Sequence, residues 1–348
     1  MKIYMAPLEG VTGYIFRNAY EEFYGKGRVD KYFIPFISPN KSKGYTTREQ
    51  NDIRPEHNVG INTVPQIMAN DSELFLEAAA MLNDMGYKEI NLNLGCPSGT
   101  VVSKFRGAGF LARPLELDSF LDKVLSSPVM KDMNMSVKTR TGLNSHEEFR
   151  LLLEIYNDYP LSEIIIHPRV RTDYYKNTPD MEIFKWAVEE SRNPVCYNGD
   201  IFTIEDYTRF TEMCPGVDRI MLGRGFVGNP GIIGQIGHKE TPQGSEEDGE
   251  NAHRLEGKND SRDNVTIDEK LNIIAADTLK KFTDRLLNDY IRVMDNEVNA
   301  MHKMKEVWIY INQFNPGNEK AFKKIKKSHR LSEYEAGVEE FVNSMKYL

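Results

Sequence analysis

Eight short apolar segments recur along the first two thirds of the chain, and each is followed by an amphipathic or loop-forming segment. We expect strands at residues 3–7, 32–36, 64–68, 89–95, 135–139, 163–168, 194–199 and 219–224. One intervening run, 72–85, has Ser72 as its expected helix N-cap and Gly86 as its stop. Strand alternating with helix implies parallel pairing, and eight such units in about 235 residues match a (β/α)8 TIM barrel. A doubly wound open sheet is the alternative, but no GxGxxG motif follows the first strand.

The size and composition of the chain limit the classes of protein to consider. Its 348 residues have room for one large domain and a smaller one. No run approaches the ~20 apolar residues of a membrane span, and the start, MKIYMAPLEG, is too polar for a signal peptide. We therefore expect a cytoplasmic protein without a membrane partner. No protein partner is implied either, so we expect a monomer.

The cysteines and histidines do not indicate a disulfide frame or a metal site. The three cysteines, Cys96, Cys196 and Cys214, form no CxxC pair, and the seven histidines show no HExxH spacing. We expect no catalytic metal. The net charge of −8 argues weakly against a nucleic-acid partner, but residues 270–348 hold 14 basic and 11 acidic side chains. The C-terminal part therefore differs from the rest of the chain in the sign of its net charge.

The C-terminal third has two parts. Residues 238–264 are nearly free of apolar residues and carry 8 acidic and 4 basic side chains, which is typical of a mobile linker. From Thr266 the pattern is helical, with an apolar face in 289–314 that includes Val293, Val298, Met301, Met304, Val307 and Trp308. We expect a TIM-barrel catalytic domain at 1–237, an acidic linker at 238–264, and a small C-terminal helical bundle domain at 265–348.

Most strand ends carry residues suited to a site. In a barrel, site residues lie at the carboxyl ends of the strands. Seven of the eight expected strands end in polar residues, proline or glycine; only the second, which ends near Pro35, does not. The residues are Pro7, Gln66, Asn93 with Cys96, Lys138 with Arg140, His167 with Arg169, Asn198 with Asp200, and Gly223 with Arg224. Loops are polar in any case, but a set converging on one ligand is the interpretation we favour.

Three features of this set indicate a flavin mononucleotide (FMN) site. NGD at 198–200 and GRG at 223–225 follow the seventh and eighth strands, where barrels often bind phosphate. Lys138 is costly to bury without a partner, and an electron-rich ring would provide one. Lys138, His167 and Gln66 around a flat heterocycle, with a phosphate grip beyond, describe a flavin site. Each of these residues also has a purely structural alternative. NGD and GRG could be ordinary glycine turns, His167 a core histidine, and Cys96 a structural thiol.

The motifs in order resemble one known family. MAPLEGVTGYIFR, NLNLGCPS, VKTRTG, HPRVR, NGD and GRGFVGNP are similar, in order and spacing, to the tRNA-dihydrouridine synthases. The resemblance covers residue 3 to about residue 231 and continues more loosely through the helical tail. It implies an FMN-dependent TIM barrel with a helical tRNA-binding domain, and NADPH-driven reduction of the C5–C6 double bond of uridines in tRNA.

The resemblance also implies roles for individual residues. Cys96 matches the proton donor of the family. The flavin would be lined by the backbone of Pro7, Leu8 and Glu9, its ring bound by Gln66, Lys138 and His167, and its phosphate held by Asn198, Gly199, Asp200, Gly223 and Arg224. The residues that match family positions near the flavin and the target nucleotide are Asn93, Lys138, Arg140, Arg169 and Arg171, and Tyr175 is a further candidate.

A basic cluster in the tail adds a candidate binding surface for tRNA. Lys323, Lys324, Lys326 and Lys327 lie with His329 and Arg330 in one eight-residue segment, and they suit phosphate-backbone binding as well as a solvated helix face. An exposed base gives little affinity by itself, so a basic helical tail fits a tRNA substrate.

The sequence departs from the family pattern in two motifs, and its acidic segment is also unusual. Gly13 stands where the family often has Asp, and HPRV stands where HGRT is common, so the backbone near Pro168 is expected to differ. Three other functions compete. They are a small-molecule FMN oxidoreductase of the dihydroorotate or dihydropyrimidine dehydrogenase type, a non-enzymatic RNA-binding scaffold, and an aldolase-like barrel with a Schiff base on Lys138. The basic tail is the feature that disfavours the first.

Overall fold

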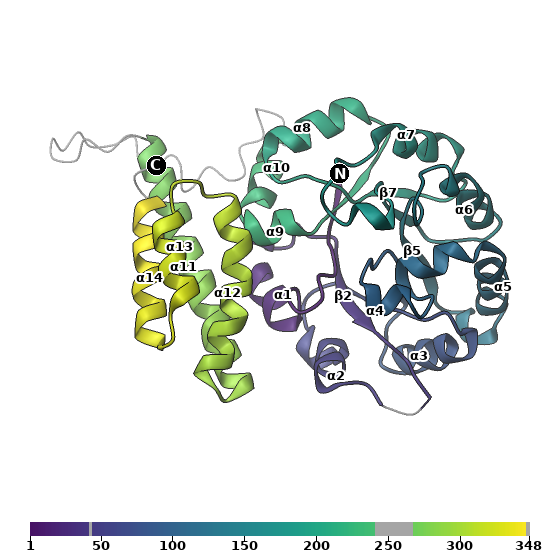
Figure 1. Cartoon of the computed structure of the whole chain (residues 1–348), viewed down its shortest axis with the longest axis horizontal. Helices are drawn as coiled ribbons and strands as arrows, with labels where there is room; N and C mark the ends of the chain where they lie inside the picture. The colour runs from purple at the N-terminus through teal and green to yellow at the C-terminus, as the bar shows by residue number, and fades with distance from the viewer. Residues whose placement is uncertain (42–43, 241–266, 346–348) are drawn as a thin grey trace. The chain divides into compact units, whose positions relative to one another are not determined.

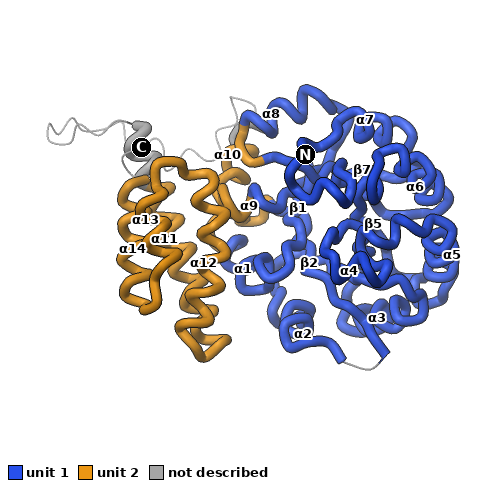
Figure 2. The backbone as a smooth tube through the Cα atoms, viewed as in Figure 1, with its two compact units in different colours: residues 1–21, 29–201, 205–225 blue, residues 22–28, 202–204, 226–348 orange. Residues whose placement is uncertain are grey.

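The computed structural model describes residues 1–41, 44–240 and 267–345 (Figure 1). They belong to two compact units, shown in different colours in Figure 2, one of residues 1–21, 29–201 and 205–225 and the other of residues 22–28, 202–204 and 226–348. The predicted domain boundaries at 237 and 265 stay predictions. Helix α10 (Ile232–Glu240) occupies the first residues of the segment predicted as a linker, and the rest of that segment, 241–264, lies outside the described residues.

The first unit contains eight parallel strands that close into a barrel in chain order, which confirms the predicted TIM barrel. Each predicted strand overlaps an observed one, and their ends differ by two residues at most. The strands are β1 (Lys2–Met5), β2 (Lys31–Ile37), β3 (Thr63–Ile67), β4 (Glu89–Leu94), β5 (Asn134–Arg140), β6 (Ile164–His167), β7 (Val195–Tyr197) and β8 (Arg219–Leu222).

Helices alternate with the strands and surround them, as Figure 1 shows for α2, α3, α5, α6 and α7. The helices up to the end of the barrel are α1 (Tyr14–Tyr20), α2 (Thr47–Ile53), α3 (Ser72–Asp84), α4 (Gly99–Val102), α5 (Pro114–Leu125), α6 (Glu148–Asn157), α7 (Met181–Glu190), α8 (Ile204–Met213) and α9 (Arg224–Gly228).

The observed ends of helix α3 can be compared with the predicted N-cap, Ser72, and the predicted stop, Gly86. The predicted N-cap Ser72 was wrong by one residue, because the carboxylate of Asp71 accepts hydrogen bonds from the backbone N–H groups of Glu73 and Leu74. Gly86 follows the helix with a φ of 96°, so the predicted stop is confirmed.

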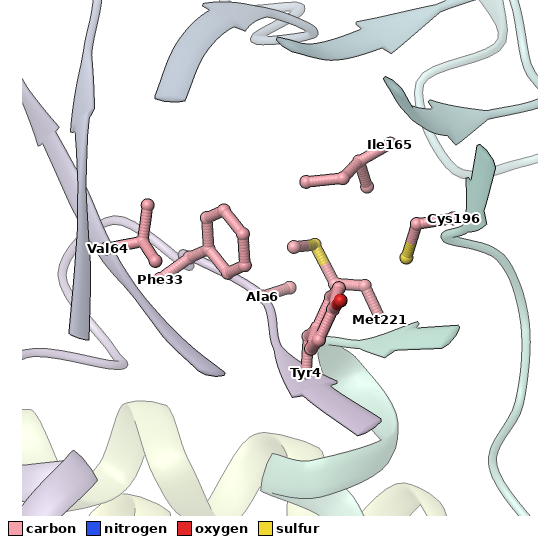
Figure 3. Close-up of a cluster of buried hydrophobic side chains, with 7 residues drawn as sticks. All are labelled: Tyr4, Ala6, Phe33, Val64, Ile165, Cys196 and Met221. Carbon is pink, nitrogen blue, oxygen red and sulfur yellow. The ribbon is translucent and has the colours of Figure 1, made fainter. Parts of the chain in front are cut away.

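The interior of the barrel is apolar on one side. Seven buried side chains from β1, β2, β3, β6, β7 and β8 or their ends point toward one another (Figure 3): Tyr4, Ala6, Phe33, Val64, Ile165, Cys196 and Met221. Because they come from opposite walls of a closed barrel, they must lie inside it. Strands β4 and β5 contribute none of them. Their interior positions carry amides, a hydroxyl and a lysine.

The amino end of the barrel is closed by paired charges. Glu163, whose side chain is fully buried, accepts hydrogen bonds from the hydroxyl of Tyr4 at 3.0 Å and from Lys31 Nζ at 2.8 Å. Lys31 also contacts Glu89 at 2.8 Å, and Arg219 contacts Glu163 at 3.3 Å. Burial alone would lower the pKa of Lys31, but the attraction of Glu163 and Glu89 outweighs it and raises that pKa.

The second unit contains the C-terminal helices α11 (Ile267–Met294), α12 (Glu297–Gln313), α13 (Glu319–Lys327) and α14 (Leu331–Met345). Trp308 is fully buried, donates a hydrogen bond to the hydroxyl of Tyr334 at 2.8 Å, and packs edge-on against Phe341. The described helices include none with the length and apolar character that crossing a membrane requires.

The predicted apolar face across 289–314 was partly wrong. Val293 and Val298 are about half exposed, because the chain turns at Asp295, which has a φ of 47°, and restarts with Asn296 as the N-cap of α12. The continuous helical pattern concealed this break.

Candidate active site

The carboxyl ends of the barrel strands bring most of the predicted site residues together. Asn93 on β4 is the register partner of Lys138 on β5, and Arg140 on β5 is the partner of His167 on β6. Cys96 lies just past the end of β4. These residues therefore form neighbouring positions at one rim.

Cys96 is half-buried, and its loop is fixed by Asn93. The Asn93 side-chain oxygen accepts hydrogen bonds from the backbone N–H groups of Gly95 at 3.1 Å and Cys96 at 3.0 Å. Burial raises the pKa of the Cys96 thiol, and the opposing effects of Arg140 and Lys138 are smaller. The thiol is therefore protonated at neutral pH, which suits a proton donor.

Lys138 is an unpaired cation. Within residues 1–41, 44–240 and 267–345, no side chain or carbonyl forms a hydrogen bond or ion pair with its ammonium group. Burial, followed by repulsion from Arg140, lowers the pKa of Lys138 to about 8. Such a group is satisfied only when an electron-rich partner approaches it.

His167 is buried and neutral. Burial and the nearby cations Arg140 and Lys138 hold its pKa well below the usual value. Arg169 Nη1 lies 3.0 Å from His167 Nε2, and a guanidinium can only donate, so Nε2 is the acceptor. The proton of the ring is therefore on Nδ1, which remains a donor.

An ion-pair network links the ends of β6, β7 and β8. Arg169 is fully buried and donates to both carboxylate oxygens of Asp200, at 2.9 and 2.5 Å. Arg224 donates to the same carboxylate at 2.6 Å. Asp200 therefore fixes two arginines, and its own charge is balanced by them.

Arg140 holds the loop after β6 against the loop after β4. Its three guanidinium nitrogens donate to the carbonyls of Gly95 at 3.0 Å, Val170 at 2.9 Å and Tyr174 at 2.9 Å. This clamp sets the position of the following residue, Tyr175, whose half-exposed ring lies 4.6 Å from the Arg224 guanidinium and 5.5 Å from that of Arg140.

Arg171, at the start of the same loop, keeps a free donor. Its Nε is one of the few buried polar atoms in the described part of the chain that lack a hydrogen-bond partner. An unsatisfied donor of this kind is suited to an incoming anionic ligand.

The backbone of the predicted phosphate loops is closely packed. A Cβ at position 225 would lie 2.3 Å from the carbonyl oxygen of Ile201, so only glycine lets the segments after β7 and β8 approach each other. Gly223 lies beside Ala6 and Leu8. Asn198 donates to the carbonyl of Met221 at 2.8 Å, which joins the ends of β7 and β8.

The segment after β1 uses part of its own polar backbone. Leu8 N–H donates to the Thr12 hydroxyl at 2.8 Å, and the Leu8 carbonyl accepts from Val11 and Thr12. Glu9 is exposed and pairs with Arg48 at 3.1 Å. Pro7 is half-buried at the end of β1.

Sequence reasoning missed two buried polar residues beneath the rim, Asn91 and Ser136. Gln66 donates to Asn91 at 2.7 Å, and Asn91 donates to the Ser136 hydroxyl at 2.9 Å. The alternation of Asn91 and Asn93 on one strand was the available signal, since it places both amides on the same face.

The predicted basic cluster lies on helix α13 of the second unit. The side chains of Lys323, Lys324, Lys326 and Lys327 are exposed, whereas Ala321 and Ile325 are buried. Lys324 forms an ion pair with Glu340 of α14. The lysines therefore belong to the solvent face of an amphipathic helix.

The charges at the rim suit an anionic, planar cofactor. Lys138, Arg140, Arg169 and Arg224 act on His167 or on one another, and Asp200 is the carboxylate that pairs with two of them. The excess positive charge, with the unpaired Lys138 and the orphaned Arg171 Nε, fits a flavin nucleotide, which brings a phosphate and an electron-rich ring.

A TIM barrel whose rim gathers cations beside a protonated thiol has an arrangement suited to a cofactor-dependent enzyme. A family model described as "Dihydrouridine synthase (Dus)" matches residues 4–339. The chain therefore belongs to the dihydrouridine synthase family, whose members are oxidoreductases that modify tRNA. Membership implies a tRNA substrate and a flavin cofactor.

Individual relatives agree with the family model. The chain is 28% identical over 243 residues to a tRNA-dihydrouridine(16) synthase of Pseudomonas syringae pv. tomato, which covers 68% of this chain and 74% of that protein. It is 30% identical over 235 residues to tRNA-dihydrouridine synthase B of Vibrio cholerae, which covers 67% of this chain and 70% of that protein.

Solved structures support the fold alone. Histamine dehydrogenase from Rhizobium sp. 4-9 is 11% identical with a TM-score of 0.52, covering 68% of this chain and 46% of that one. A 2-naphthoyl-CoA reductase complex is 11% identical with a TM-score of 0.50, covering 68% of this chain and 50% of that one.

Proposed function

We propose that this enzyme reduces uridines in tRNA to 5,6-dihydrouridine with FMN as its cofactor and NADPH as its reductant. When bound, FMN re-reduced by NADPH would supply the hydride that adds to the C5–C6 double bond of uridine. The observation that carries the proposal is the unpaired Lys138 ammonium at the rim, on the strand beside the loop of the protonated Cys96 thiol.

Different residues of the rim would bind different parts of the cofactor. Lys138 would place its charge against the ring, and His167 would donate from Nδ1. Gln66 has an amide hydrogen and a lone pair left after its two hydrogen bonds, so it can still contact the ring. Pro7, Leu8 and Glu9 would line the ring by backbone, although the Leu8 N–H already donates to Thr12.

The phosphate of FMN would lie at the loops after β7 and β8. Asn198, Gly199, Asp200, Gly223 and Arg224 form these loops. Arg224 brings a positive charge that Asp200 holds at this point, and glycines let backbone N–H groups approach an anion. Asp200 would act by holding Arg224 and Arg169 in place, because a carboxylate does not itself attract a phosphate.

Cys96 would supply the proton that completes the reduction. After hydride has added to one carbon of the uracil ring, the S–H bond breaks, a C–H bond forms at the adjacent carbon, and a thiolate remains until water protonates it. A raised pKa keeps the thiol protonated before the reaction, and Lys138 and Arg140 stabilise the thiolate afterwards. Asn93 and Arg169 are the other donors able to face the developing charge.

The target uridine must leave the tRNA stack to reach the rim. Arg171 has a free buried donor for it or for its phosphate, and Tyr175 offers an exposed ring for stacking. The lysines of α13 would bind the tRNA backbone, where charge rather than base identity determines affinity.

Substitution of Cys96 tests the proton donor. We expect Cys96→Ala to keep the flavin absorbance and NADPH oxidation but to reduce uridine in tRNA about 10²- to 10⁴-fold more slowly, since a general acid contributes that much. Cys214→Ala, which alters a buried cysteine near the amino end of β8, is the control. Undiminished tRNA reduction by Cys96→Ala would disprove the assignment.

A further inference from the structure

A chain of buried hydrogen bonds runs inside the barrel from β5 to the loop of Cys96. Ser136 donates to the carbonyl of Ile90 at 3.4 Å and accepts from Asn91 Nδ2 at 2.9 Å. Asn91 Oδ1 accepts from Gln66 Nε2 at 2.7 Å, and Gln66 Oε1 accepts from Asn93 Nδ2 at 2.6 Å. Asn93 Oδ1 accepts from Gly95 and Cys96 N–H. The four side chains are at most 7% exposed.

The direction of every bond in this chain is determined by its ends. Two backbone N–H groups can only donate, so Asn93 must turn its oxygen toward them and its NH₂ toward Gln66. Gln66 must then present its oxygen to Asn93 and its NH₂ to Asn91. Asn91 in turn must donate to Ser136, whose hydroxyl proton goes to a carbonyl. Reversing one amide would place two donors or two acceptors together.

We propose that Asn91 and Ser136 are positioning residues for Cys96. They bind nothing at the rim, but they supply the partners that hold the Gln66 amide in the orientation that Asn93 requires, and Asn93 holds the backbone at Cys96. The proposal rests on the proposed function only in treating Cys96 as the proton donor.

Loss of the Ser136 hydroxyl removes the acceptor of the Asn91 amide. Asn91 Nδ2 then has no acceptor, and a reversed Asn91 would oppose its NH₂ to that of Gln66. Either arrangement leaves one buried donor unsatisfied, and the cost can pass along the chain until Asn93 releases the Cys96 loop. A small displacement of a reacting group is enough to slow proton transfer substantially.

Four variants separate positioning from a general loss of packing. Ser136→Ala and the nearly isosteric Asn91→Leu break the chain. Asn91→Asp preserves it, because a carboxylate accepts from both Gln66 and the Ser136 hydroxyl, which can rotate. Thr139→Val is the matched control, since Thr139 is a fully buried hydroxyl on the same strand that bonds Arg140 O and lies 3.2 Å from the Tyr156 hydroxyl, outside the chain.

Two measurements are made on flavin-loaded protein. The first is the rate at which iodoacetamide alkylates Cys96, the half-exposed member of the three cysteines, identified by peptide mass. The second is single-turnover reduction of tRNA by prereduced enzyme, together with the Kd for tRNA. We expect Ser136→Ala and Asn91→Leu to change alkylation several-fold and to slow reduction roughly 10-fold at unchanged Kd. Asn91→Asp should stay close to the unmodified enzyme.

Equal alkylation and reduction in Ser136→Ala, Asn91→Leu and Thr139→Val would overturn the proposal. So would an Asn91→Asp variant that behaves like Asn91→Leu, and this comparison decides the matter if Ser136→Ala does not fold. The alkylation measurement does not depend on what Cys96 does. If Cys96→Ala proved active, that measurement would still decide whether the chain positions the thiol.

Discussion

The two ends of the barrel both gather charge, but they treat it differently. At the amino end, Lys31 and Arg219 contact the buried Glu163 at 2.8 and 3.3 Å, and the tyrosine hydroxyl of Tyr4 completes the cluster. At the carboxyl end, Lys138 has no partner in the described part of the chain, and Arg171 has a buried Nε without one.

This difference indicates that the charges at the amino end stabilise the fold, whereas those at the carboxyl end serve to bind a ligand. The amino end neutralises its charges internally, so it needs no ligand and serves to close the barrel. The carboxyl end keeps an excess of positive charge that destabilises the empty protein. A folded chain retains such a cost where a ligand removes it, which is why the unpaired end is the one that we assign to FMN.

The largest effect should follow from breaking the paired end. Lys31→Met leaves the buried Glu163 with a weakened set of partners, and we expect the free energy of unfolding to fall by about 3–5 kcal/mol. Urea unfolding followed by circular dichroism measures it. Lys185→Met, which removes one partner of an exposed ion pair with Glu182 on α7, should cost less than about 0.5 kcal/mol. Similar small losses in both variants would contradict the comparison.

A Lys→Met substitution at the unpaired end should change the free energy of unfolding in the opposite direction. Lys138→Met removes a cation whose pKa burial has lowered from 10.5 to about 8, so we expect the flavin-free protein to become more stable by about 1–3 kcal/mol. Affinity for FMN should fall at the same time, as fluorescence titration can measure. A flavin-free Lys138→Met protein that is less stable than the unmodified one would place Lys138 among the structural charges.

The pH dependence of stability gives a third and finer test. The pKa of Lys138 is about 8 in the folded protein and near 10.5 in the unfolded chain, so between these values the unfolded chain binds more protons. The stability of the flavin-free protein should therefore rise with pH in this window relative to Lys138→Met, and the difference between the two proteins should close. Urea titrations at pH 7, 8, 9 and 10 measure it. A difference that stays constant would exclude a titrating lysine at this position.

Much of the fold and of the rim could be predicted from the sequence, because the signals for them lie within short segments of the chain. Each strand combines an apolar run with a polar or glycine end, and in a parallel barrel these ends meet whatever the details of packing. His167, Lys138 and Cys96 were therefore placed at one rim correctly.

The remaining features depend on partners that are distant in sequence. Asp200 was predicted to hold phosphate, but its negative charge is neutralised by Arg169 and Arg224. These three residues come from three different loops, so the sequence does not show that they meet. Gly13 looked like a departure from the family, yet Asp52 of α2 accepts the N–H of Tyr14 at 2.7 Å and so caps α1 from outside. No pattern in residues 13–20 shows this, because the carboxylate comes from 38 residues away.

The smallest effect on stability is expected for the exposed lysines of α13, which water already satisfies. We expect the triple variant Lys323→Glu, Lys326→Glu and Lys327→Glu to change the free energy of unfolding by no more than about 0.5 kcal/mol. It should nevertheless weaken tRNA binding, and it should lower the slope of log K against log salt by roughly 0.7–0.9 for each phosphate that the variant no longer neutralises.

A second triple variant with the same change in charge separates direct binding from a general electrostatic effect. Lys88, Lys123 and Lys131 are exposed in the barrel unit, and Lys88 and Lys131 precede β4 and β5 at its amino end. Their replacement by Glu should leave the salt dependence nearly unchanged, because that end faces away from the reactive rim. If both triple variants weakened binding equally in filter-binding titrations, tRNA would be responding to net charge alone. The lysines of α13 would then be a solvated helix face, and the distinction between self-contained and ligand-directed charge would apply only to the barrel.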